Sequence, residues 1–157
     1  MSLAGTATAS RQFATFRLDD YYFGVEVLRV QEVIRYQDMT RVPLAPRVVQ
    51  GLINLRGQIV TAIDLRRRFD LPERQDGEQP MNVVVRTSDG VVSLLVDGIG
   101  DVIETSPADF EPAPETIHGA ARELVTGVYK LKDRLMLALD VERACALDPD
   151  HAGERRN

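Results

Sequence analysis

The sequence predicts an all-β protein built from two small barrels that pack together. The first observation is a series of short apolar or β-branched runs at regular spacing, separated by turn residues and only brief helical segments. The second is an internal repeat: residues 51–65 return without a gap as residues 127–141, and residues 25–34 return as residues 94–103. Two segments that are each repeated, in the same order along the chain, indicate two similar β subdomains.

Four pairs of runs predict β-hairpins, because turn residues separate the members of each pair. The pairs are 13–18 with 22–27, 52–55 with 58–63, 81–87 with 91–96, and 128–131 with 135–139. The third pair has the strongest signal, since Ser88-Asp89-Gly90 places Asp-Gly between two valine-rich runs. The second and fourth pairs are the two copies of the repeat, with turns at Arg56-Gly57 and Lys132-Asp133.

Each copy of the repeated hairpin ends in an aspartate, Asp64 or Asp140, followed by a short segment that carries arginine. Aspartate is a favoured N-cap residue, so both carboxylates are expected to accept N–H bonds from a first helical turn. The basic cluster Arg66-Arg67-Arg68 is then expected to be the solvated face of a helix.

Three segments interrupt the strand pattern. Residues 42–46 carry two prolines and lead into one expected turn of helix at residues 47–50, ended by Gly51 in a left-handed C-terminal position. Residues 71–80 are expected to be a polar connector between the halves. Residues 107–114 contain three prolines, which a central strand does not tolerate, so they are expected to be a crossing loop.

Charge and composition restrict the partners. The formal net charge is −5, and no Lys/Arg block is long enough to follow a phosphate backbone, which argues against nucleic acid. Cys145 is the only cysteine and lies in an apolar run, so a reducing compartment and a role as a small hydrophobe are expected. No stretch could span a bilayer and the first eleven residues lack a signal-like apolar core, so a cytoplasmic protein without membrane insertion is expected.

Candidate catalytic residues are scarce. His118 and His151 are the only histidines, and neither has a Cys or His at metal-ligand spacing. A Ser/His/Asp triad is assembled in space and is not excluded by spacing, but no Gly-x-Ser-x-Gly elbow occurs. Residues 97–100 (DGIG) lack the further glycine or Gly-Lys-Ser/Thr ending of a phosphate loop, so a glycine-bent strand is expected. No catalytic residue, metal or cofactor is assigned.

Five blocks of sequence together resemble a known family. They are residues 30–34 (VQEVI), 42–46 (VPLAP), 51–57 (GLINLRG), 63–65 (IDL) and 96–103 (VDGIGDVI). In this order they are similar to successive signatures of the CheW family of bacterial chemotaxis coupling proteins. The resemblance runs from about Phe13 to Leu147.

The resemblance implies a domain over residues 12–147 made of two SH3-like five-stranded barrels. The ends at 1–11 and 148–157 are expected to be disordered, the second because it is polar. It also implies a non-catalytic adaptor that links the cytoplasmic tips of transmembrane chemoreceptors to the regulatory domain of the histidine kinase CheA. In CheW proteins the positions that match Val30, Glu32 and Arg56 lie at the receptor-binding region.

Glu32 and Arg56 are the charged members of otherwise apolar segments, and we expect them to pair across the open face of the first barrel. Arg56 could also reach a partner carboxylate through its forked donors. The alternative is a purely intramolecular pair.

Apolar residues either line a groove for a receptor helix or belong to the core, since alternating strand residues fit both roles. These residues are Val27, Val30, Val33, Ile99 and Val102. The kinase surface is assigned to the second barrel. Its candidates are Asp97, Gly98, Ile99, Asp101, Lys132 and Asp133.

The chain departs from the family pattern in places. Thr61 stands where many relatives carry proline, a change expected to affect only the strand bend. Glu111 and Thr116 stand where a basic and an aromatic residue often occur, in a region of lateral array contacts. An adaptor of another pathway, such as twitching motility, therefore stays open. So does a small β-barrel ligand- or nucleic-acid-binding protein, which needs Arg47 and residues 66–68 in one basic stripe.

Overall fold

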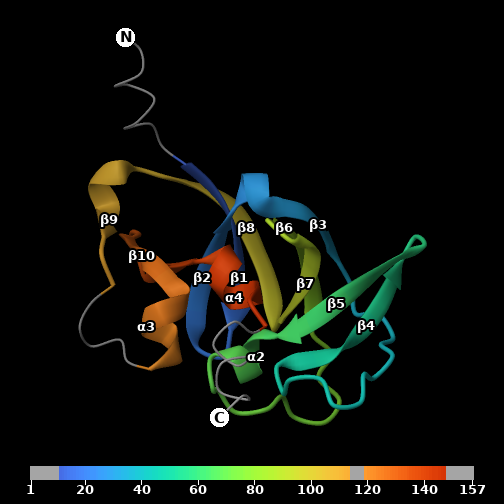
Figure 1. Ribbon diagram of the computed structural model, residues 1–157. Coiled ribbons are helices and arrows are strands. Elements are labelled where there is room, and N and C mark those ends of the chain that lie inside the picture. The colour runs from blue at the N-terminus through green and yellow to red at the C-terminus, as the bar shows by residue number, and fades with distance from the viewer. Residues whose placement is uncertain (1–10, 114–118, 148–157) are drawn as a thin grey trace, which may run out of the picture.

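The computed structural model describes residues 11–113 and 119–147, which form two β-sheets (Figure 1). Sheet A has the strand order β8-β1-β2-β11-β10-β9 and sheet B the order β3-β6-β7-β5-β4. The strands of sheet A are β1 (Arg11–Leu18), β2 (Tyr21–Glu26), β8 (Gly98–Thr105), β9 (Phe110–Glu111), β10 (Val125–Lys130) and β11 (Leu135–Leu139). Those of sheet B are β3 (Val30–Ile34), β4 (Val49–Leu55), β5 (Gln58–Asp64), β6 (Met81–Thr87) and β7 (Gly90–Val96). The all-β prediction and all four hairpins are confirmed.

The two sheets repeat one arrangement of strands. The hairpin β1–β2 in sheet A occupies the place of β6–β7 in sheet B, and β10–β11 occupies the place of β4–β5. In both sheets the two hairpins join through a parallel pair, β2 with β11 and β5 with β7. The predicted duplication into two similar subdomains is therefore confirmed.

The strand at one edge of each sheet comes from the other half of the sequence. Strand β3 follows β2 but pairs with β6, whereas β8 follows β7 but pairs with β1. These strands lie in the repeated segments 25–34 and 94–103. Because the two segments have the same pattern, each can form the edge strand of the opposite sheet. Residues 71–80 consequently join two parts of sheet B, and the prediction that they connect the two subdomains is wrong.

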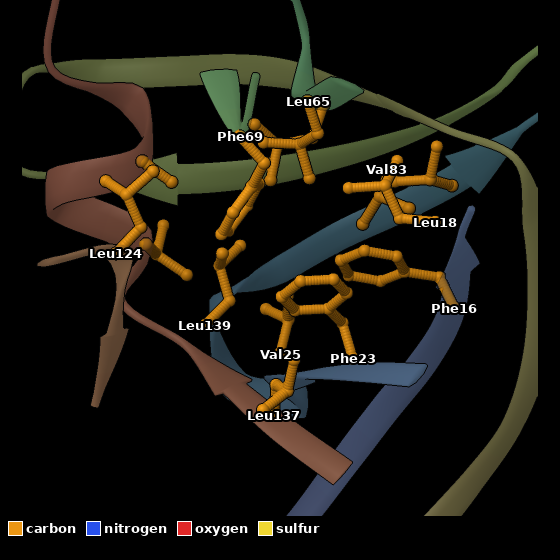
Figure 2. Close-up of a cluster of buried hydrophobic side chains, with 14 of the residues drawn as sticks. Phe16, Leu18, Phe23, Val25, Leu65, Phe69, Val83, Leu124, Leu137 and Leu139 are labelled. Carbon is orange, nitrogen blue, oxygen red and sulfur yellow. The ribbon is translucent and has the colours of Figure 1, made fainter. Parts of the chain in front are cut away.

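A shared apolar core lies between the sheets. The Phe16 and Phe23 rings of sheet A stack with centroids 5.5 Å apart, and Figure 2 shows them beside Phe69 and Leu139. Strand β6 alternates in the manner of a two-sided sheet, because Val83 and Val85 enter this core while Val84 faces the opposite side. Each barrel thus has an interior of its own in addition to the shared core. The cluster of sheet A contains Phe13, Tyr129, Met136 and Ala138, and that of sheet B contains Ile53, Leu55, Val60 and Val84.

Short helices follow both copies of the repeat. Helix α2 (Leu65–Arg68) begins after Asp64, whose Oδ1 accepts the Arg66 N–H at 3.0 Å. Helix α4 (Val141–Cys145) begins after Asp140, whose Oδ1 accepts the Arg143 N–H at 3.1 Å. Both predicted caps are confirmed. The third helix, α3 (Ala120–Leu124), precedes β10, and no helix in the described ranges is long and apolar enough to cross a membrane.

The arginines of α2 turn inward, so the prediction of a solvated helix face is wrong. Arg66 is only 13% exposed and donates to the carboxylate of Asp97. Arg68 donates to the carbonyl oxygens of Ala144, at 3.0 Å, and Ala146. The helix has a single turn and lies where the sheets meet, so its side chains reach α4 and β7 before they reach solvent.

Two loops differ from expectation. Residues 47–50 form no helix: a turn closed by the Val49 N–H on the Pro46 carbonyl (2.9 Å) leads straight into β4. Gly51 is a strand residue there, and a Cβ at this position would lie 2.8 Å from the Thr40 carbonyl, which bridges to Leu52. The proline-rich loop contains a 3-10 turn (Pro107–Asp109) and the short strand β9.

The glycine-bent strand predicted at residues 97–100 is confirmed in β8. The register of β8 against β1 shifts between Ala14 and Phe16. Gly100 lies at this irregularity, where a Cβ would approach the Thr15 hydroxyl to 2.5 Å. Glycine therefore permits the bulge that curves the edge of sheet A.

Candidate docking surfaces

The Glu32–Arg56 pair joins the two edges of sheet B. Glu32 lies on β3 and Arg56 directly follows β4, and these are the outer strands of the sheet. Arg56 Nη2 donates a hydrogen bond to Glu32 Oε2. This bond lowers the pKa of Glu32 and raises the pKa of Arg56. The predicted pair is confirmed and ties the open edges of the barrel together.

The β4–β5 turn presents Arg56 at the tip of a projecting hairpin (Figure 1). Arg56 and Gly57 have φ of 53° and 90°, as a type I′ turn requires, and Asn54 Oδ1 accepts the Gly57 N–H at 2.8 Å. The Arg56 side chain is 68% exposed, whereas that of Glu32 is 23% exposed. A guanidinium has five N–H donors, so Arg56 keeps donors free for a partner carboxylate while it holds Glu32.

The apolar candidates separate into two groups. Val27 and Val30 are half-buried, and Val30 packs against the shared core. Val33 on β3 is exposed, as are Ile99 and Val102 on β8. Both strands are sheet edges, which leaves one side of each strand without a neighbour in the sheet.

A concave apolar surface lies at the end of sheet A, over parts of β1, β2, β8 and β11. Tyr21, Ile99 and Leu135 are partly exposed there, and the Arg134 guanidinium sits 4.3 Å from the centre of the Tyr22 ring. We refer to this surface as the sheet A groove. Among Tyr21, Ile99 and Leu135, only Ile99 was predictable as a surface residue, because alternation along a strand does not distinguish a groove wall from core.

Asp97 occupies a buried ion-pair network. Its carboxylate is 8% exposed, accepts 2.7 and 3.0 Å hydrogen bonds from Arg66, and accepts the Asp19 N–H at 2.6 Å. Arg74 Nε lies 3.0 Å from Asp97 Oδ1, and Arg74 Nη1 lies 3.0 Å from Asp64 Oδ1. The network joins the β1–β2 turn of sheet A to α2 and residues 71–80 beside sheet B. The carboxylate of Asp97 is thus committed to internal contacts, unlike the other kinase-surface candidates.

Those other candidates lie on two parts of the second barrel. Gly98, Ile99 and Asp101 belong to the edge strand β8, and Asp101 is exposed. Lys132 and Asp133 form the exposed β10–β11 turn. Both groups lie in sheet A, whereas the Arg56 hairpin belongs to sheet B, so neither group neighbours that hairpin in the strand order.

The basic stripe needed for a nucleic-acid binder is absent from the described residues. Arg66 and Arg68 turn inward as described above, while Arg47 and Arg67 both pair with Glu73 at 3.3 Å. A surface that follows a phosphate backbone needs its positive charges exposed and unpaired. This alternative is therefore contradicted by the placement of its own arginines.

The Cys145 thiol is free and buried, which disfavours a role as a nucleophile. Burial raises the pKa of its thiol to about 12, so the reactive thiolate is scarce near neutral pH. Within residues 11–113 and 119–147, no group of three or more His, Cys, Asp or Glu side chains is arranged to hold a metal ion. His118, His151 and Thr116 lie outside the described residues.

Comparisons with known proteins agree with this architecture. The family model CheW-like domain matches residues 12–147. A chemotaxis protein CheW from Klebsiella aerogenes is 34% identical over 149 residues, which cover 90% of each chain. One from Treponema pallidum is 30% identical over 136 residues, covering 84% of this chain and 80% of the relative.

A solved structure is also similar. The scaffolding protein TtCheW from Thermoanaerobacter tengcongensis superposes with a TM-score of 0.78 at 26% identity, covering 85% of this chain and 91% of the other. The residues that the family model matches run from β1 to α4 and so include both sheets. The chain therefore belongs to the CheW-like domain family and is a non-catalytic scaffold of chemotaxis signalling, with two SH3-like subdomains.

Proposed function

We propose that this adaptor couples the cytoplasmic tips of chemoreceptors to the regulatory domain of the histidine kinase CheA, through two separate surfaces. The observation that carries the proposal is Arg56, which is fixed by Glu32 and a tight turn yet remains 68% exposed at a hairpin tip. A charge held in place but left open to solvent is suited to recognise a carboxylate. The adaptor itself needs no turnover, because it acts by holding two partners together.

The receptor arm is assigned to Val30, Glu32 and Arg56, with exposed Val33 beside them on β3. A receptor tip is a helical hairpin, and a helix binds through apolar anchors in a groove with charged residues at the rim. Val33 supplies apolar area and Arg56 supplies the charge. Glu32 acts as a positioning residue, since its carboxylate faces Arg56 and is mostly covered.

The kinase arm is assigned to sheet A, through Gly98, Ile99 and Asp101 on β8 and Lys132 and Asp133 in the β10–β11 turn. These residues are exposed or half-exposed and lie in the opposite sheet from Arg56. Asp97 supports this arm indirectly, because its internal ion pairs fix the start of β8.

A charge swap tests the receptor arm against a purely structural pair. Arg56→Glu places two carboxylates together, so it should reduce binding of a receptor cytoplasmic fragment. The double variant Glu32→Arg with Arg56→Glu restores an ion pair with reversed polarity. We expect the swap to recover the wild-type melting temperature but not receptor binding. Recovery of both would show that the pair matters only within the chain, and the receptor arm would be wrong.

The two lysines test the kinase arm. Lys130 and Lys132 are the only lysines, and both lie on the β10–β11 hairpin. An amine-reactive bifunctional crosslinker should therefore link lysines of the kinase regulatory domain to this hairpin if the arm is correct. Lys132→Arg should keep binding and remove its crosslink, whereas Lys132→Glu should weaken binding. Crosslinks confined to the N-terminal amine would contradict the assignment.

A further inference from the structure

The loop between β3 and β4 presents a leucine entirely to solvent. Leu44 is fully exposed and has a φ of 67°, a left-handed conformation that leucine adopts at a cost. Three other non-glycine residues in the described ranges have positive φ: Asp19, Arg56 and Asp70. Each of these has an internal hydrogen bond, whereas the Leu44 side chain buries no surface. The strain at Leu44 therefore has no compensation within its own contacts.

The loop holds Leu44 in a defined place. Pro43 and Pro46 restrict the backbone on either side. The Ala45 N–H donates to the Val42 carbonyl at 3.3 Å. Just before the loop, Thr40 exchanges 2.9 and 2.8 Å backbone hydrogen bonds with Leu52 of β4. A residue in a strained conformation that its surroundings enforce is typical of a binding site.

The surroundings of the loop are basic. The side chains of Arg41, Arg47 and Arg67 line the same surface, while the whole chain carries a charge of −5. Glu73 pairs with Arg47 and Arg67, but Arg41 has no ion pair or hydrogen bond to any described residue. A partner here would meet an apolar knob with positive charge beside it, so its complement is an apolar pocket rimmed by carboxylates.

Shape distinguishes between the two partners of the proposed function. A receptor tip is a helical hairpin, whose convex surface fits a groove. A projecting leucine needs a concave receiver, which a pocket in a globular domain provides more readily than the rounded surface of a helical hairpin. We propose that Leu44, supported by Arg41, is a further anchor for the kinase regulatory domain, inserted into an acid-rimmed apolar pocket of that domain. This inference rests on the proposed function. It adds to the kinase arm of sheet A a second contact, made by the loop between β3 and β4 of sheet B.

The test uses a substitution that should stabilise the fold while it removes the anchor. Leu44→Gly relieves the left-handed strain, so the melting temperature should rise by a few degrees. Its affinity for the kinase regulatory domain should fall about tenfold or more, as for a central anchor residue. Leu44→Asn, which tolerates this backbone conformation, should lose the same affinity and so exclude added flexibility as the cause. Leu28→Ser, at another exposed leucine, is the matched control and should keep affinity.

Each outcome bears on a separate claim. A variant that melts higher and binds the kinase domain as wild type does would overturn the anchor but leave the proposed function intact. Failure of the wild type to bind the kinase domain would refute the proposed function itself. Loss of receptor-fragment binding in Leu44→Gly would refute the choice of partner. Flotation with anionic phospholipid vesicles that depends on Leu44 would also overturn it, because the anchor would then face a membrane.

Discussion

Replacing Asp97 with asparagine should destabilise the protein strongly, because this carboxylate ties the two subdomains together. The Asp97 side chain is 8% exposed, and its partners Arg66 and Arg74 are 13% and 11% exposed. Removing one member of a buried charge pair costs about 3–5 kcal/mol. Asparagine retains one carbonyl acceptor, so we expect the lower end, roughly 3 kcal/mol, or about 6–12 °C in Tm for a chain of this size.

The assay is thermal and urea unfolding at pH 7, with Asp101→Asn as a matched control. Asp101 lies four residues further on, within β8, and is exposed, so its variant should stay within about 0.5 kcal/mol of wild type. A double-mutant cycle with Arg66→Met should give a smaller loss than the sum of the single changes. Equal stability of Asp97→Asn and Asp101→Asn would refute the reasoning.

Acid provides a second readout of the same network. Burial opposes ionisation of Asp97, but the hydrogen bonds from Arg66 and the Asp19 N–H outweigh it, so the pKa of Asp97 is lowered. A lowered folded-state pKa means that the stabilisation is present above the unfolded pKa of about 3.9 and is lost as pH falls through the lower folded value. Asp97→Asn should remove this part of the acid dependence, whereas Asp101→Asn should retain it.

Two further predictions concern the core. Native Cys145 should resist a thiol reagent at pH 7 and react at full rate only in denaturant, since it is buried with a thiol pKa of about 12; rapid native labelling would contradict its placement. Ser93→Ala should cost about 1–3 kcal/mol in denaturant unfolding, because the buried Asn82 Oδ1 loses its 2.7 Å hydrogen bond from the Ser93 hydroxyl. The double variant Asn82→Val with Ser93→Ala should recover part of that loss, because it leaves no unsatisfied amide at position 82. If it recovers none, the Ser93 hydroxyl stabilises the fold through a different contact.

Local signals along the chain predicted most of the fold. The turn at Ser88-Asp89-Gly90 and the caps Asp64 and Asp140 depend on neighbouring residues alone, and all are present. The exchange of β3 and β8 between sheets was not predictable, because both strands have the same pattern and pairing is decided over long range. The prediction that Gly51 ends a helix was wrong. Glycine is required there because the Thr40 carbonyl, which is distant in sequence, approaches the backbone closely.

The docking surfaces were predictable only in part. Glu32 and Arg56 stood out as charges in apolar segments, and their pairing followed. No comparable pattern marked Asp97 and Arg66 in the sequence. A buried ion pair between subdomains uses the same residue types as a surface ion pair, so the sequence does not distinguish the two. Tyr21 and Leu135 begin strands whose alternation fits core and groove equally, so only their exposure in the folded chain assigns them to the sheet A groove.

Simultaneous binding is the most direct test of an adaptor with separate surfaces. The measurement is sedimentation of this chain with a receptor cytoplasmic fragment and the kinase regulatory domain, alone and together. We expect one complex that contains all three proteins, with Arg56→Glu removing only the receptor fragment and Lys132→Glu removing only the kinase domain. Competition between the two partners for the chain, with no complex of all three, would contradict the account.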